Sequence, residues 1–179
     1  MFCLGEITRL QNGYYSSVIV HQNQIYAAET ASREINVFEY TQSALTKLRT
    51  IKLLFAHNKN KRDATLKMCA TNNGLACSSS THNEIQEYSF NGEFRQIYGR
   101  PGSGEAGQLA FPRICDVDTC GSVLITDCDN NRLQVMSEQG EFCVLDLEPE
   151  VSGPVSAAIF SGHLYVTSGN RTTIHKYSL

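Results

Sequence analysis

Residues 114–135 read ICDVDTCGSVLITDCDNNRLQV, which is three short, mainly apolar runs separated by small polar residues. Within the runs, apolar residues tend to recur at every second position, a spacing typical of β-strands that bury one face. Cys120-Gly121 joins the first two runs, and glycine tolerates the positive φ of a tight hairpin turn. The segment therefore predicts three consecutive antiparallel strands.

The same plan occurs four times along the chain. In each copy, an apolar residue of the second run precedes an apolar residue of the third run by ten residues. Successive copies lie 50, 48 and 41 residues apart, which is the size of one blade of a β-propeller. The repeat therefore predicts an all-β fold, a β-propeller of four-stranded antiparallel blades with about four blades. The repeated pairs are Ile25 and Ile35, Leu75 and Ile85, Val123 and Leu133, and Leu164 and Ile174.

The two ends of the chain predict how the ring closes. Outer strands are expected at Phe94–Tyr98 and Phe142–Leu145, but the sequence stops at the third strand of the last blade. Phe2–Leu4 resembles an outer strand, so we expect residues 1–5 to complete the last blade and remove two free sheet edges. A fragment of a six-bladed ring and a larger ring made by two chains remain as alternatives. The predicted single domain, 1–179, has blades at approximately 13–53, 64–98, 111–147 and 153–179 plus 1–5.

Composition limits the classes of function. The chain has 179 residues, 15 Lys and Arg against 18 Asp and Glu, and a net charge of −3. Its apolar stretches are shorter than the ~20 residues of a membrane span. Its first ten residues, which include Glu6 and Arg9, do not read as the basic and then apolar regions of a secretory signal. Seven cysteines without a CxxC motif favour free thiols. We therefore expect a cytoplasmic protein with no membrane contact.

One segment resembles a known repeat family. Residues 99–112 read GRPGSGEAGQLAFP and are followed by two strands, a small polar loop and the strand Arg132-Leu133-Gln134-Val135. This pattern resembles the NHL repeat with its glycine-rich linker, specifically over residues 99–142 and more weakly over 153–179. The resemblance implies an NHL-type propeller such as the one that ends tripartite-motif (TRIM) proteins, so a parent protein could be a ubiquitin ligase.

The polar residues of this pattern have a structural interpretation. Short polar side chains such as those of Asp127 and Asn131 often bond nearby backbone, so we expect these two to hold neighbouring blades together. No catalytic sequence motif occurs, and the five histidines occupy unlike positions in the repeat. We therefore expect no enzyme activity, no catalytic residue, no cofactor and no metal ion.

Basic residues suggest where a partner binds. Residues 47–67 contain seven of the fifteen basic residues and one acidic residue, a net charge of +6. Because blade strands alternate in direction, the segments between blades and the loops from second to third strands share one face. We expect this face to bind a protein partner. RNA is the alternative that the resemblance implies, because some TRIM–NHL propellers bind RNA stem-loops there. A propeller enzyme of lyase or hydrolase type is a further alternative. The protein is expected to be a monomer or a ring-completing dimer. The candidate binding residues are Arg33, Lys59, Lys61, Arg62, Arg100, Arg132 and Arg171.

Overall fold

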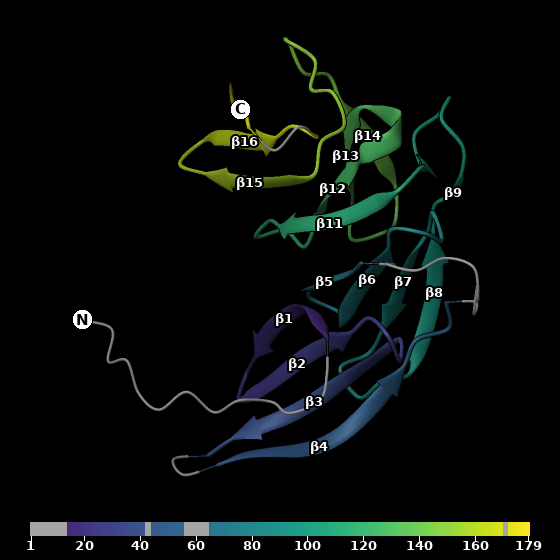
Figure 1. Cartoon of the computed structure of the whole chain (residues 1–179), viewed down its shortest axis with the longest axis vertical. Helices are drawn as coiled ribbons and strands as arrows, with labels where there is room; N and C mark the ends of the chain where they lie inside the picture. The colour runs from purple at the N-terminus through teal and green to yellow at the C-terminus, as the bar shows by residue number, and fades with distance from the viewer. Residues whose placement is uncertain (1–13, 42–43, 56–64, 170–171) are drawn as a thin grey trace.

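The structure is built almost entirely from β-strands, which form four successive antiparallel sheets (Figure 1). The computed structural model describes residues 14–41, 44–55, 65–169 and 172–179. Strands that follow one another in the chain are neighbours in each sheet, as in the blade of a propeller. Blade one contains β1 (Tyr15–His21), β2 (Gln24–Glu29), β3 (Glu34–Tyr40) and β4 (Leu45–Lys52); blade two contains β5 (Leu66–Ala70), β6 (Leu75–Ser79), β7 (Ile85–Tyr88) and β8 (Phe94–Tyr98); blade three contains β11 (Pro112–Val117), β12 (Val123–Asp127), β13 (Arg132–Met136) and β14 (Phe142–Leu145); blade four contains β15 (Ser156–Phe160), β16 (His163–Thr167) and β17 (Ile174–Ser178).

Two small elements lie outside the blades. A parallel ribbon of β9 (Arg100–Pro101) and β10 (Gln108–Leu109) forms in the segment between blades two and three. One 3-10 turn, η1 (Cys128–Asn130), connects β12 to β13. In the part of the chain that the structure describes, no helix has the length and apolar character needed to cross a membrane.

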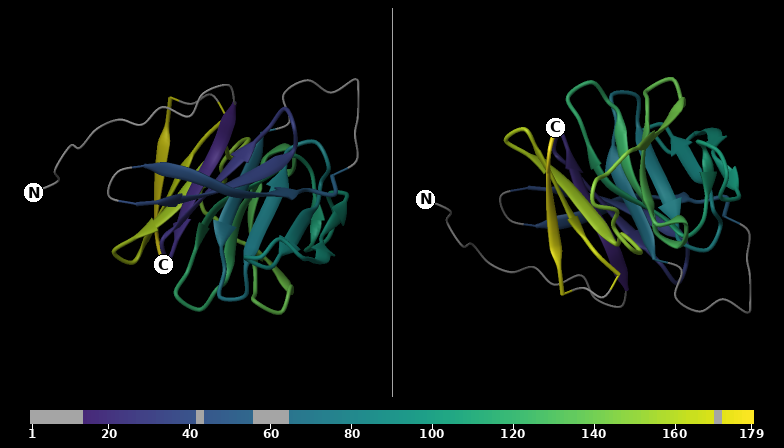
Figure 2. Two further views of the ribbon diagram at one scale, coloured as in Figure 1. Left: turned by 90° about the horizontal axis from the view of Figure 1, so that it is seen from below. Right: turned by 90° about the horizontal axis from the view of Figure 1, so that it is seen from above.

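The blades follow one another through their first strands. β1 contacts β5, β5 contacts β11, and β11 contacts β15. Figure 1 shows the sheets as a curved row that runs from blade one, in purple and blue, to blade four, in yellow-green, and Figure 2 gives the views from below and above. The predicted all-β propeller of about four blades is confirmed, as are the outer strands at Phe94–Tyr98 and Phe142–Leu145.

Among the described residues, blade four has the three strands that the sequence predicts for residues 153–179. The segment expected to supply its outer strand, residues 1–5, lies outside the described residues, so closure of the ring by the N-terminus stays a prediction.

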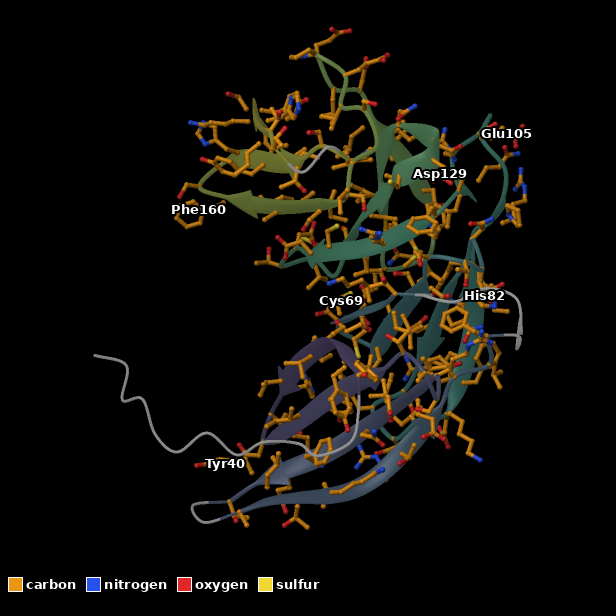
Figure 3. The ribbon with its side chains drawn as sticks, in the orientation of Figure 1. Tyr40, Cys69, His82, Glu105, Asp129 and Phe160 are labelled. Atoms are coloured by element: carbon orange, nitrogen blue, oxygen red, sulfur yellow. The ribbon has the colours of Figure 1, made fainter. Side chains whose placement is uncertain are left out.

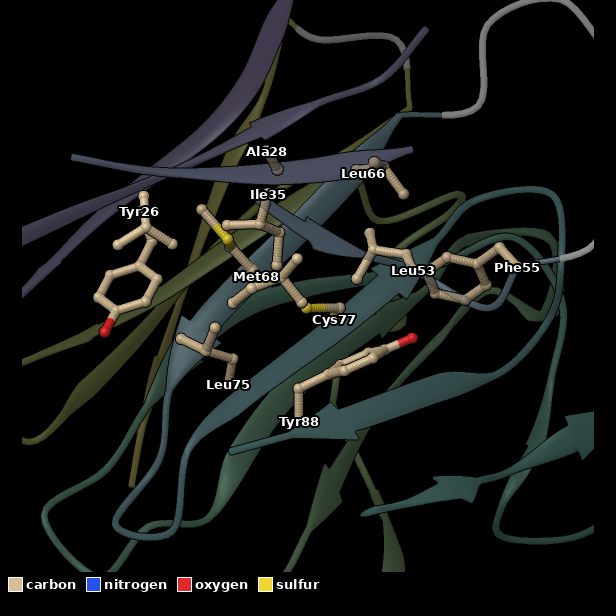
Figure 4. Packing of buried hydrophobic residues seen from close by; sticks show 12 residues of the cluster. Tyr26, Ala28, Ile35, Leu53, Phe55, Leu66, Met68, Leu75, Cys77 and Tyr88 are labelled. Atoms are coloured by element: carbon tan, nitrogen blue, oxygen red, sulfur yellow. The ribbon is translucent and has the colours of Figure 1, made fainter. Parts of the chain in front are cut away.

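The hydrophobic core is divided into three clusters, each lying between two adjacent blades. Ile35 of blade one packs with Leu75 of blade two in the first cluster (Figure 4). The second cluster joins blades two and three around Ile85 and Ile125, and the third surrounds Leu164 between blades three and four. The second strands of the central blades, β6 and β12, are buried at every position, so these blades bury residues on both faces.

Tyr88, at the end of β7, lies in the first cluster with its hydroxyl group directed at the segment after β4 (Figure 4). Its hydroxyl donates a hydrogen bond to Gln86 Oε1 at 2.6 Å and accepts one from the Leu54 backbone N–H at 2.7 Å. Burial raises the pKa of Tyr88 to about 12, because the phenolate form would lose its hydration. The neutral phenol therefore helps to join blade one to blade two.

Replacement Tyr88→Phe is expected to lower the free energy of unfolding at pH 7 by about 1 kcal/mol, since the Leu54 N–H loses its shorter hydrogen bond and keeps only the one to Gln86 Oε1 at 3.1 Å. A pKa that is higher in the folded state gives stability that is complete below pH 10 and declines as the pH rises toward 12. Between pH 7 and pH 11 the free energy of unfolding of the wild-type protein should therefore fall by roughly 1 kcal/mol more than that of the variant. Urea unfolding at both pH values measures this difference. Tyr40→Phe, at an exposed tyrosine, is the control, and an equal loss in wild type and Tyr88→Phe would contradict the assignment.

Candidate functional site

One face of the molecule gathers the segments between blades and the loops that join second to third strands. We call it the linker face and define it by residues 30–33, 80–84, 99–111, 128–131 and 146–155. Three residues with positive φ close its second-to-third-strand loops: Arg33 at 57°, Asn83 at 54° and Asn131 at 53°. Each lies two residues before the apolar third-run residue of its repeated pair, which is Ile35, Ile85 or Leu133. The repeat therefore extends to the backbone conformation of this face.

These three residues each bond the segment that leaves their own blade. Arg33 Nη1 donates to the Phe55 carbonyl at 3.2 Å. Asn83 Oδ1 accepts from the Phe111 N–H at 3.0 Å, and Asn131 Oδ1 accepts from the Gly153 N–H at 2.8 Å. The loops and the interblade segments of the linker face are therefore bonded to each other in each of blades one to three, and the expected structural role of Asn131 is confirmed.

The most prominent feature of the linker face is the glycine-rich loop, residues 99–111. Its tip, Ser103–Ala106, is exposed to solvent, whereas Leu109 is fully buried. Asn130 Nδ2 donates to the Gly102 carbonyl at 2.8 Å, and Gln108 Oε1 accepts from the Gly104 N–H at 2.7 Å. Glu105 is labelled near the tip in Figure 3.

Two side chains of β13, those of Arg132 and Gln134, form hydrogen bonds with the backbone of the same loop. Arg132 Nη2 donates to the carbonyls of Glu105 and Gln108 at 2.9 and 2.7 Å. Gln134 accepts from the Gly107 N–H at 2.9 Å and donates to the Gln108 carbonyl at 2.8 Å. Blade three therefore fixes the conformation of a loop whose tip faces solvent.

The carboxylate of Asp127 binds the side chains that hold the glycine-rich loop. Its side chain is fully buried, and its carboxylate accepts hydrogen bonds from the Ala110 N–H at 2.6 Å and from Arg132 Nε at 2.9 Å. Asn130 Nδ2 and Gln134 Nε2 each donate to the same carboxylate at 2.8 Å. The charge of Asp127 is therefore balanced by Arg132 and fully hydrogen-bonded, which confirms the structural role expected for it.

The candidate binding residues lie in different environments. Arg132 is used in the ion pair with Asp127 and in the loop contacts, and Arg33 bonds the Phe55 carbonyl. Arg100 is exposed and forms an ion pair with the exposed Glu105. The structure thus brings Arg100 and Arg132 together at the glycine-rich loop, while Arg33 lies in blade one. The remaining candidates, Lys59, Lys61, Arg62 and Arg171, lie outside the described residues.

Sequence reasoning missed Asn83 and Gln134 as components of this face. The signal was present, because Asn83 precedes Ile85 by the same two residues that separate Asn131 from Leu133. Gln134 is a polar residue within a strand and is completely buried. Such a residue needs partners in the interior, which here are the loop backbone and Asp127.

A cavity of about 580 Å³ lies between the first strands of the four blades. Lys67, Arg113 and Asp116 supply charged groups to its lining. Asp116 Oδ2 accepts a hydrogen bond from the Ile159 N–H at 3.1 Å. Burial, together with the charge of Asp116, raises the pKa of the lining thiol Cys69 to about 12.

Within the described part of the chain, no three His, Cys, Asp or Glu side chains are grouped so that they could hold a metal ion. All six cysteines of this part are free.

Comparison with known proteins shows the fold alone. No protein-family model matches the sequence, and no curated protein matches it. A protein of unknown function from Bacteroides thetaiotaomicron superposes with a TM-score of 0.74 at 14% identity, over 93% of this chain and 47% of that one. The catalytically inactive H270A form of virginiamycin B lyase from Staphylococcus aureus gives 0.62 at 14%, over 96% and 58%. Glutaminyl cyclase from Myxococcus xanthus gives 0.54 at 11%, over 93% and 66%.

These likenesses define the class of protein as a β-propeller. They do not show that it is an NHL-repeat propeller. The chain spans just over half the length of the lyase that it matches.

The expectation that the chain is not an enzyme needs correction. Two of the similar folds belong to enzymes, a lyase and a cyclase, so this architecture supports catalysis. The inference from missing sequence motifs was wrong because a propeller draws site residues from loops of several blades, whose spacing in sequence follows no compact motif.

Proposed function

We propose that this β-propeller binds a protein partner through its linker face, with the glycine-rich loop at the centre of the contact. The observation that carries the proposal is a solvent-exposed tip, Ser103–Ala106, on a loop fixed by Arg132, Gln134 and Asn130. A loop that is already held in one conformation loses little conformational entropy when a partner binds. Surface loops positioned by a rigid scaffold are common binding elements.

The charge around this loop favours a protein over RNA. Exposed Glu105 lies beside Arg100, and exposed Asp129 belongs to the neighbouring loop. A phosphate backbone requires a surface dominated by Lys and Arg, whereas a protein surface can complement both signs of charge. The resemblance of residues 99–112 to an NHL linker adds support for an interaction module.

The test compares two double variants of the full chain. Arg100→Ala with Glu105→Ala removes an exposed ion pair from the loop, and should change the free energy of unfolding by at most about 1 kcal/mol. Thr119→Ala with Gln139→Ala alters exposed residues in the hairpins of the opposite face and serves as the control. Each tagged protein is used to enrich partners from cell extract, which are identified by mass spectrometry.

Proteins retained by wild type and by the control, but lost with the loop variant, are the expected result. Equal retention by all three proteins contradicts the proposal. A second measurement titrates labelled RNA stem-loops into the wild-type protein at several salt concentrations. Tight RNA binding that weakens steeply with salt would show that the partner is RNA and not a protein.

A further inference from the structure

One position of the repeat places polar side chains around the central cavity. The cavity lies on the inner side of the curved row of blades, where Cys69, one of its lining residues, is labelled in Figure 3. In each blade, a residue near the start of the first strand pairs with the residue three after the apolar second-run residue of the repeat. In blades two and three this start adjoins the interblade segment, so the position lies at the cavity end next to the linker face. The four residues at this position, all in the cavity lining, are Ser17, Lys67, Arg113 and Ser156.

The two cations at this position have no counter-ion in the part of the chain that the structure describes. Neither Lys67 nor Arg113 lies within ion-pair distance of a carboxylate there. Asp116 is the one acidic residue of the described lining. Its Oδ1 accepts from the Val117 N–H at 2.9 Å, and its Oδ2 accepts from the Ile159 N–H at 3.1 Å. Because backbone N–H groups already bind Asp116, both cations of the lining are available to an anion.

Arg113 is held in a position where its donors lack an acceptor. Its guanidinium carbon lies 5.1 Å from the centroid of the Phe111 ring, a cation–π contact that restricts the group. Its Nε atom is buried and has no hydrogen-bond partner among the described residues. Arg132, by contrast, donates to the Asp127 carboxylate and to backbone carbonyls. A buried donor without an acceptor is unfavourable, so the Nε of Arg113 indicates a partner outside the chain, such as a bound ion or ordered water.

Ser17 adds a hydroxyl group from the first blade. Its Oγ accepts a hydrogen bond from the Met68 N–H at 3.2 Å, which places it at the junction with β5, the strand that carries Lys67. This contact uses an oxygen lone pair and leaves the hydroxyl hydrogen available to a ligand. An arginine, a lysine and a hydroxyl group from three successive blades are donors that suit the oxygens of a phosphate group.

The opposite end of the cavity is apolar in the two central blades. Ala70 and Val117 are the last residues of β5 and β11, and both line the cavity. Asp116, next to Val117, repels an anion from this end. The cavity volume of about 580 Å³ falls within the range of small-molecule sites. A ligand with an anionic head and a compact apolar body therefore complements the two ends of the cavity.

We propose that the central cavity binds a small phosphate monoester, with its phosphate group between Lys67 and Arg113 and its apolar part toward Ala70 and Val117. A phosphate monoester carries close to two negative charges at pH 7, which match the two cations, whereas a carboxylate carries one. Arginine offers a fork of donors to the phosphate oxygens, and lysine adds a compact charge. The inference rests on the cavity lining and is independent of the partner proposed for the linker face.

Calorimetric titration of the full chain with phenyl phosphate, in a buffer free of phosphate, tests this proposal. We expect one site per chain and weaker binding of benzoate, which has the same ring but a single charge. Lys67→Gln and Arg113→Gln should each weaken the binding of phenyl phosphate at least about 10-fold, since each removes a charge-assisted hydrogen bond. Lys47→Gln, at an exposed lysine of the outer strand β4, is the matched control and should bind phenyl phosphate as the wild type does.

Urea unfolding of the same proteins shows that each variant is folded and gives a second measure of binding. Phenyl phosphate should raise the unfolding midpoint of the wild type and of Lys47→Gln, and should raise it less for the two cavity variants. These variants lie in different blades, so either one decides the outcome where the other fails to fold. No binding by the wild type, benzoate binding as tight as that of phenyl phosphate, or equal binding by the cavity variants and the control would overturn the proposal.

Discussion

Replacement Asp127→Ala is expected to lower the free energy of unfolding by about 3–5 kcal/mol, because it leaves a largely buried Arg132 without its counter-ion. The Ala110 N–H, Asn130 and Gln134 lose an acceptor in the same step. A loss of this size is a large part of the total stability of an ordinary domain, about 5–15 kcal/mol. The glycine-rich loop should lose its fixed conformation, and blade three should be destabilised with it.

Urea unfolding followed by circular dichroism measures this effect. Asp129→Ala is the control two residues away, since the Asp129 side chain is exposed, and it should change the free energy of unfolding by less than about 0.5 kcal/mol. Asp127→Asn keeps the shape of the side chain and removes its charge, so its loss should fall between those of the two alanine variants. Equal stability of Asp127→Ala and Asp129→Ala would show that the buried network contributes little.

Replacement Gly74→Ala is expected to cost about 2–4 kcal/mol, because the added methyl group has no room. A Cβ atom at Gly74 would lie 2.0 Å from the Tyr88 carbonyl oxygen and 3.1 Å from the Ser89 Cα atom. Both atoms belong to the backbone at the end of β7, so relief requires a shift of the β5–β6 hairpin. That hairpin is held by the Thr71 N–H, which donates to the Gly74 carbonyl at 2.8 Å.

Gly162→Ala provides the matched control in the β15–β16 hairpin. Its Cβ would meet nothing within 4 Å, but its φ of +72° is unfavourable for alanine. This substitution should therefore cost only about 1 kcal/mol, the price of the left-handed conformation. Thermal and urea unfolding of the two variants separate steric contact from backbone strain. A cost at Gly74 no greater than that at Gly162 would contradict the close packing at Tyr88.

The strands and their grouping into blades could be predicted because one physical pattern repeats. Alternating apolar residues and turn glycines place the outer strands at Phe94–Tyr98 and Phe142–Leu145, as observed. The hydrogen-bonding role of Asp127 and Asn131 was also predictable, since short polar side chains beside turns bond the backbone.

The environments of the basic residues could not be predicted in the same way. Charge in a loop suggests an exposed side chain, yet Arg132 lies against Asp127 and two backbone carbonyls. The direction of Arg33 depends on its left-handed backbone conformation, which no local pattern of apolar residues specifies. Likewise, alternation in β1 predicts an apolar face at Val18 but does not show whether a neighbour covers it.

The division of the core into three clusters has a consequence for how such a protein changes in evolution. Each cluster is shared by only two adjacent sheets, so no single centre unites the whole molecule. Duplication or deletion of a blade then alters one boundary and leaves the interior of the others intact. The number of blades is thereby a property that gene rearrangement can change in one step, without compensating substitutions throughout the chain.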